Sequence, residues 1–122
     1  MTDLRQAIIA ATATLTQAGI DSARTDAELL AAHVAGTERG RLSLLDAPES
    51  DFFDRYDRAV ATRAKRTPLQ HITGFAAFGP VLLQVGPGVF IPRPETEALL
   101  EWALAQPLPR DSVIIDLCTG SG

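Results

Sequence analysis

Apolar residues recur every three or four positions through the first 67 residues of the chain, a spacing that predicts amphipathic helices. A first helix is expected to have Thr2 as its N-cap and to stop at Gly19. A second is expected to open at Asp21 or Ser22 and to end at Gly36. The positions expected to face the core are Leu4, Ile8, Ala11, Leu15 and Ala18 in the first helix, and Ala27, Leu30, Ala31 and Val34 in the second.

Two further helices follow from the same pattern. A short one is expected from Thr37 and Arg39 to Leu45, with its leucines 42, 44 and 45 facing inward. A longer one has Ser50 as its expected N-cap and ends before Pro68, because the residue before a proline disfavours helix. It carries the apolar residues Phe53, Tyr56, Val60 and Ala64. Four helices with short connections predict a small bundle.

The pattern changes at Thr67. From residue 75 to residue 90 the chain is richer in aromatic and β-branched residues, punctuated by Gly79-Pro80 and Gly86-Pro87-Gly88, which predicts a β-hairpin. The residues expected on its strands are Phe75, Phe78, Leu82, Leu83 and Val85. The segment from Ile91 to Pro94 is too rich in proline for a helix or strand interior. Pro94 suits the first turn of a helix from Glu95 to Ala105.

The end of the chain combines an apolar run with a loop of small residues. Val113, Ile114 and Ile115 predict a buried central strand of a parallel sheet, since such strands are apolar on both faces. A central strand needs neighbours for its backbone groups, and the sequence offers none, so we interpret the chain as the front end of a larger protein. Without that sheet, residues 112–122 are expected to be mobile, wrongly paired or packed on the hairpin.

Residues 116–122 read Asp-Leu-Cys-Thr-Gly-Ser-Gly. Glycines after a buried strand let the backbone approach a ligand closely. The acidic Asp116 just before the loop would repel a pyrophosphate but suits a ligand with positive charge, such as the sulfonium of S-adenosylmethionine. A Gly-rich turn in any α/β protein remains the alternative interpretation of the loop.

Composition narrows the function classes. A chain of 122 residues is long enough for one domain with a core, and its net charge of −4 argues against a nucleic-acid binder that relies on bulk electrostatics. The single cysteine excludes an internal disulfide and fits a reducing compartment. Residues 5–13 resemble a signal peptide only weakly, and an amphipathic helix is the better interpretation of this segment. No apolar run in the sequence approaches the roughly 20 residues that cross a bilayer. We expect a cytoplasmic protein.

Two further features have mainly structural interpretations. The basic residues of the fourth helix alternate with acidic ones, which favours a solvated face with ion pairs inside the helix. These residues are Arg55, Arg58, Arg63, Lys65 and Arg66, among Asp51, Asp54 and Asp57. His33 and His71 are far apart without a ligand cluster, so no metal site is expected. His71 is interpreted as a turn histidine with backbone partners.

Four segments together resemble the release-factor glutamine methyltransferase family: Arg66–Gly74, Phe78, Ile91–Glu97 and Asp116–Gly122. By shape alone the Pro-Arg-Pro turn within them favours a rigid elbow between domains. The resemblance implies a helical substrate-recognition domain (1–67), a β-hairpin linker (68–92) and the start of a methyltransferase domain (93–122). The implied fold class is α+β overall: an N-terminal α-helical bundle, a β-hairpin linker and the first strand of a truncated Rossmann-like α/β domain.

The resemblance also implies an activity. The family transfers a methyl group from S-adenosylmethionine to the side-chain amide of the glutamine in the Gly-Gly-Gln loop of peptide chain release factors. The implied cofactor-binding residues are Cys118, Thr119, Gly120, Ser121 and Gly122 in the loop, with Phe90, Arg93 and Thr96 from the hairpin exit and helix start. The family more often has glycine at position 118.

No catalytic residue is assigned within residues 1–122, which contain no Asn-Pro-Pro-Tyr, the family's motif for gripping the glutamine amide. We expect a monomer whose partners are release factors, with no membrane and no direct nucleic-acid contact. A nucleic-acid amino-methyltransferase and a non-enzymatic helical interaction module are the alternative functions.

Overall fold

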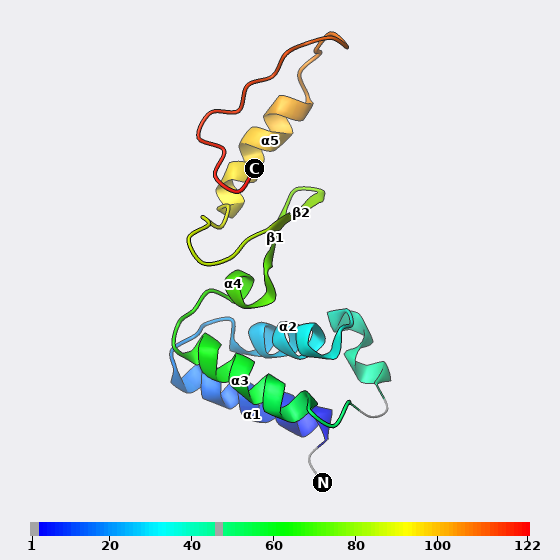
Figure 1. Cartoon of the computed structure of the whole chain (residues 1–122), viewed down its shortest axis with the longest axis vertical. Helices are drawn as coiled ribbons and strands as arrows, with labels where there is room; N and C mark the ends of the chain where they lie inside the picture. Colours follow the sequence, from blue (N-terminus) through cyan, green and yellow to red (C-terminus); the bar gives the residue numbers. More distant parts are fainter. Residues whose placement is uncertain (1–2, 46–47) are drawn as a thin grey trace. The chain divides into compact units, whose positions relative to one another are not determined.

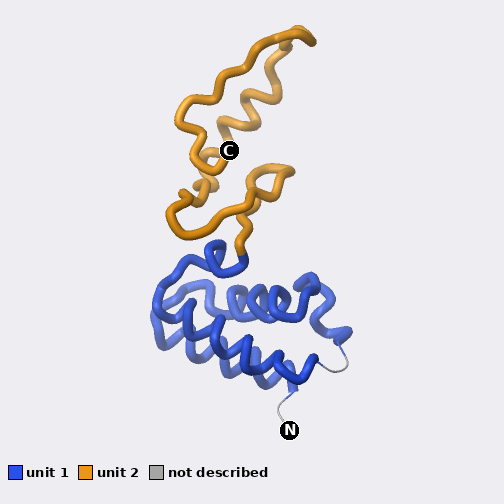
Figure 2. Tube along the Cα trace, viewed as in Figure 1, with its two compact units in different colours: residues 1–73 blue, residues 74–122 orange. Residues whose placement is uncertain are grey.

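The computed structural model describes residues 3–45 and 48–122, which fall into two compact units, Met1–Thr73 and Gly74–Gly122 (Figure 2). The first unit is helical and the second holds the hairpin and one more helix (Figure 1). The α+β class, with a helical bundle before a β-hairpin, is therefore confirmed. The assignment of three domains stays a prediction.

The first unit is built on three α-helices, α1 (Leu4–Gln17), α2 (Ala23–Ala35) and α3 (Phe52–Ala64). The chain runs in the same direction in α1 and α3 and in the opposite direction in α2 (Figure 1). Short elements complete the unit: the 3-10 helix η1 (Arg39–Leu44) and the short helix α4 (Leu69–Thr73). His71 thus lies on a helix rather than in the predicted turn, because the segment after Pro68 closes helical hydrogen bonds onto the carbonyl of that proline.

The helix ends follow local chemistry. The carboxylate of Asp3 accepts the N–H of Gln6 at 2.7 Å and caps α1, while the predicted cap Thr2 lies outside the described residues. Helix α2 has Ser22 as its N-cap and ends at Gly36, whose φ of +67° is the left-handed conformation that glycine adopts without strain. Both ends of α2 are confirmed.

The core of the bundle is a close-packed set of mostly small and branched side chains. It consists of Ile8, Ala11, Leu15, Ile20, Ala23, Ala27, Leu30, Ala31, Ala32, Leu42, Phe52, Tyr56 and Val60. Many alanines in this set let the helix axes come close, and the large rings of α3 fill the remaining space. The spacing of Ile8, Ala11 and Leu15, and of Phe52, Tyr56 and Val60, places each set along one helix face.

Two predictions about η1 and α3 are wrong in detail. Leu44 is 75% exposed, because a 3-10 helix has three residues per turn and only Leu42 and Leu45 share its inner face. The N-cap of α3 is Asp51 rather than Ser50, and the fully buried phenylalanine is Phe52, with Phe53 at the edge of the core.

Polar contacts tie α3 to α2 through the core. The hydroxyl of Tyr56 donates to the carbonyl of Ala27 at 2.8 Å, and the Arg63 guanidinium lies 2.8 Å from Asp26 Oδ2. Arg55 pairs with Asp51 four residues earlier, as predicted. Arg63 does not pair within its own helix, because Asp26 stands on the buried face of α2 and needs a partner there.

The second unit contains the strands β1 (Phe75–Phe78) and β2 (Val81–Gln84), paired antiparallel with Phe75 opposite Gln84 and Phe78 opposite Val81. Val85 lies just beyond β2 but still donates its N–H to the carbonyl of Gly74 at 2.9 Å. The predicted hairpin is confirmed. It is followed by the 3-10 helix η2 (Pro94–Thr96) and the helix α5 (Glu97–Leu104), close to the predicted helix from Glu95 to Ala105.

The predicted strand at Val113–Ile115 is not formed. These three side chains are 75–88% exposed, whereas burial was expected for a strand inside a parallel sheet. The hydrogen-bonding groups of a single strand need a neighbour, and in residues 3–45 and 48–122 the two strands of the hairpin pair only with each other. Within the same ranges no helix combines the length and the apolar character needed to cross a lipid bilayer.

Candidate functional site

The Pro-Arg-Pro turn is a conformationally restricted segment that leads into η2 and α5. Arg93 is extended, with φ −79° and ψ 142°, as expected for a residue before proline, and Pro94 opens η2. The N–H of Thr96 donates to the carbonyl of Arg93 at 3.0 Å and closes the first turn. The side chains of Phe90, Arg93 and Thr96 are exposed, so each can meet a ligand.

The hairpin turn is joined to the start of α5. The N–H of Gly79 donates to Glu97 Oε1 at 2.7 Å. Gly79 has φ +54° and precedes Pro80, which fits the two-residue turn that matches the twist of a hairpin. A Cβ on Gly79 would lie 2.5 Å from Leu100 Cδ2, so the turn and α5 are in close contact on that side as well. Nothing in the local sequence pattern predicts this pairing.

The small-residue loop has a left-handed backbone at three of its last five residues. Cys118, Gly120 and Gly122 have φ values of +58°, +65° and +88°, and the N–H of Gly122 donates to the carbonyl of Thr119 at 3.2 Å. A left-handed φ costs a residue with a side chain roughly 1 kcal/mol or more. That conformation fits the glycine that the resembled family more often has at position 118. The thiol of Cys118 is free and exposed.

The predicted cofactor residues form two local groups. Backbone hydrogen bonds hold each group internally, and in the described ranges none connects Phe90, Arg93 or Thr96 with residues 118–122. All eight are exposed except Ser121, which is half-buried. Their shared role at one cofactor therefore stays a prediction.

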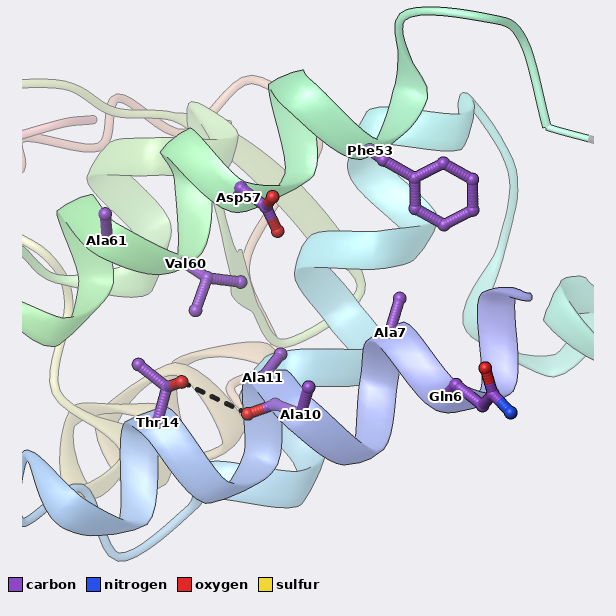
Figure 3. A pocket seen from close by; sticks show the side chains of 9 residues that line it. All are labelled: Gln6, Ala7, Ala10, Ala11, Thr14, Phe53, Asp57, Val60 and Ala61. Atoms are coloured by element: carbon purple, nitrogen blue, oxygen red, sulfur yellow. Dashed lines mark hydrogen bonds between the residues drawn. The ribbon is translucent and has the colours of Figure 1, made fainter. Parts of the chain in front are cut away.

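A groove of about 760 Å³ lies between α1 and α3 (Figure 3). Its floor is mainly apolar and built from small residues, while the Asp57 carboxylate and the Phe53 ring face it from α3 (Figure 3). Its lining consists of Gln6, Ala7, Ala10, Ala11, Thr14, Phe53, Asp57, Val60 and Ala61. The hydroxyl of Thr14 already donates to the Ala10 carbonyl at 3.1 Å. In the part of the chain that the structure describes, Asp57 forms no ion pair, so its charge is available to a partner.

The groove was not predicted from the sequence. The feature of the sequence that indicates the groove is the group of alanines Ala7, Ala10 and Ala11 of α1, which line it opposite α3. Small side chains at such positions leave space between helices that larger apolar residues would fill.

Two ionisable groups of the bundle have shifted pKa values for structural reasons. Hydrogen bonds from Arg39 and Arg24, at 2.7 and 2.6 Å, lower the pKa of Glu28 from its ordinary value of 4.5. Burial raises the pKa of the Tyr56 hydroxyl well above its ordinary value, and the nearby charge of Asp57 adds to that rise. Both residues hold elements of the bundle together: Tyr56 joins α3 to α2, and Glu28 joins α2 to η1. Across the described ranges, no three His, Cys, Asp or Glu side chains gather as metal ligands would.

Comparison with known proteins points in one direction. The family description "PrmC N-terminal domain" matches residues 6–74. The release factor glutamine methyltransferase of Mycolicibacterium smegmatis is 65% identical over 122 residues, which are 100% of this chain and 43% of that protein. The protein of the same name in Mycobacterium tuberculosis (H37Rv) is 63% identical over 119 residues, 98% of this chain and 39% of that protein. The protein of the same name in Deinococcus radiodurans is 40% identical over 125 residues, which cover 98% of this chain and 44% of that protein. The chain spans about two fifths of the length of these relatives.

Proposed function

Because the chain belongs to the PrmC N-terminal domain family, we propose that it is the N-terminal part of an enzyme that methylates a glutamine side chain of peptide chain release factors. The methyl donor is S-adenosylmethionine, and the acceptor is the amide nitrogen in the Gly-Gly-Gln loop. The observation that carries this proposal is 65% identity, over the whole chain, to a protein named release factor glutamine methyltransferase.

The second unit supplies part of the cofactor site in this proposal. Gly120 and Gly122 carry no side chain, and no heavy atom lies within 4 Å of where a Cβ would stand, so a cofactor can approach the backbone there closely. The carboxylate of Asp116, just ahead of this loop, complements the positive sulfonium of S-adenosylmethionine. Arg93 and Thr96 would line the same pocket from the start of α5. These features fit the cofactor, which supplies an activated methyl group when it is bound.

The chemistry then depends on alignment. An amide nitrogen is a weak nucleophile, so the rate acceleration comes from holding it in line with the methyl carbon and the sulfur. Groups that grip the amide are not assigned within residues 1–122. The role of this chain is to bind the donor and to orient the protein substrate.

We assign the release factor to the groove between α1 and α3 of the bundle. Its apolar floor and the free charge of Asp57 suit a protein segment that combines apolar and basic side chains. Ala61 lines this groove, and the exposed Thr62 is its neighbour outside the lining. In a full-length enzyme that carries this chain, Ala61→Lys should weaken release-factor binding about tenfold or more, while Thr62→Lys should leave it unchanged.

The cofactor part of the proposal has its own test. Arg93→Ala in the same full-length enzyme should raise the dissociation constant of S-adenosylmethionine about tenfold, since a contact from a charged group contributes roughly 1.5–3 kcal/mol. Arg110→Ala, at an exposed position in the segment after α5, is the matched control. Isothermal titration calorimetry measures both. Equal affinity for the cofactor in wild type and Arg93→Ala would remove Arg93 from the site.

A further inference from the structure

The hairpin turn and the helix that follows the Pro-Arg-Pro turn are joined at two points on one face of α5. Glu97, the first residue of α5, accepts the N–H of Gly79 at 2.7 Å. Leu100, three residues further along the helix, stands where a side chain at position 79 would lie. Positions three apart lie on the same face of a helix, so Glu97 and Leu100 hold the turn together.

The hydrogen bond is stronger than an ordinary backbone contact. Its acceptor is a carboxylate, and hydrogen bonds to ionised groups are shorter and about twice as strong as neutral ones. Glu97 also lies in the first turn of α5, where the helix dipole favours negative charge. The turn offers this N–H because the Gly79-Pro80 pair forms the two-residue loop between β1 and β2.

The joint lies next to residues predicted to meet the cofactor. Glu97 follows Thr96 directly, and Thr96 is bonded back to Arg93 at 3.0 Å. The prolines at positions 92 and 94 remove backbone freedom on both sides of Arg93. Because this segment is stiff, a displacement of Glu97 also displaces Arg93 and Thr96.

From this geometry we infer that Glu97 is a positioning residue. It fixes the hairpin turn to the start of α5 and thereby sets where Arg93 and Thr96 stand in the methyl-donor site. The inference rests on the proposed function for its last step, while the contact between Glu97 and Gly79 stands on the structure alone.

Hydrogen exchange of the Gly79 amide in the 122-residue chain tests the contact. Glu97→Ala should speed that exchange about five- to tenfold, the equivalent of losing roughly 1–1.4 kcal/mol of hydrogen bonding. Glu97→Gln keeps an oxygen acceptor and should restore most of the protection. Glu101→Ala, at an exposed position of the same helix, is the matched control and should change nothing. Unchanged exchange in Glu97→Ala would overturn the inference.

Kinetics of a full-length enzyme that carries the chain test the positioning role. Glu97→Ala should raise the KM for S-adenosylmethionine about tenfold and leave the KM for the release factor unchanged, and Glu97→Gln should rescue most of the loss. Faster Gly79 exchange with an unchanged KM for the cofactor would refute the positioning role and leave the proposed function standing. If the wild-type enzyme binds no S-adenosylmethionine, the proposed function fails together with the positioning role, whatever the exchange rate of the Gly79 amide.

Discussion

Replacing Asp26 by asparagine should destabilise the helical bundle by about 2–3 kcal/mol. Asp26 is one of the few charged groups inside the unit, with a side chain 6% exposed, and it pairs with Arg63, whose side chain is 18% exposed. Removing one partner of a buried pair typically costs 3–5 kcal/mol, because the other charge stays buried without compensation. The Arg63 guanidinium keeps some water and a bond to the Thr67 carbonyl at 3.0 Å, which places the expected cost below that range.

The assay is a double-mutant cycle by urea unfolding, followed by circular dichroism. The variants are Asp26→Asn, Arg63→Met and the two together. A loss of 2–3 kcal/mol in a unit of this size lowers the melting temperature by roughly 10–20 °C. The double variant should lose less than the sum of the single losses, with a coupling energy of about 1.5 kcal/mol or more, because it leaves neither charge unpaired.

The exposed pair of Arg55 and Asp51 provides the control, with side chains 41% and 60% exposed. Arg55→Met should change the free energy of unfolding by no more than about 0.5 kcal/mol. A coupling energy between Asp26 and Arg63 as small as that of the exposed pair would refute the reasoning from burial.

Three further predictions concern the bundle. Tyr56→Phe should lower the free energy of unfolding by about 1–1.5 kcal/mol, measured by urea unfolding, because it removes the buried 2.8 Å bond to the Ala27 carbonyl. Glu28→Gln should destabilise the chain by about 0.5–1 kcal/mol at pH 7 and low salt. The pKa of Glu28 is lower in the folded state than its ordinary 4.5, so the stability that Glu28 contributes is present above pH 4.5 and is lost as the pH falls further. A difference in unfolding free energy between wild type and Glu28→Gln that stays constant down to pH 3 would contradict this prediction. Deleting residues 1–67 from a full-length enzyme should weaken release-factor binding, measured by calorimetry, and unchanged affinity would exclude the bundle as the recognition domain.

The local signals in the sequence predicted most of the secondary structure. Gly36 ends α2 because only glycine enters the left-handed conformation without strain, and the Gly79-Pro80 pair marks the hairpin turn for a related reason. The error at Leu44 arose because apolar spacing was interpreted with a period of 3.6 where the chain forms a 3-10 helix.

Contacts between distant residues could not be predicted from one sequence. Asp26 and Arg63 are 37 positions apart, and Gly79 and Glu97 are 18 apart. Nothing in either local pattern specifies its partner. Residues 113–115 are unusually apolar, but an apolar run becomes a strand only when another strand is available to pair with it.

The candidate site divides in the same way. Prolines predicted the stiff turn at Arg93, because they restrict the backbone directly, and glycines predicted a loop at residues 118–122 that a ligand can approach closely. The left-handed backbone at Cys118 was not predicted. The groove between α1 and α3 depends on how two helices pack, and periodicity alone does not report the space between them.

The most direct test of the central claim is transfer of a labelled methyl group from S-adenosylmethionine by a full-length enzyme that carries this chain. Release factor, RNA and DNA are offered in one reaction, and mass spectrometry locates the label. We predict that the label appears on the glutamine of the Gly-Gly-Gln loop and on neither nucleic acid. Label on RNA or DNA with an unmodified release factor would contradict the account.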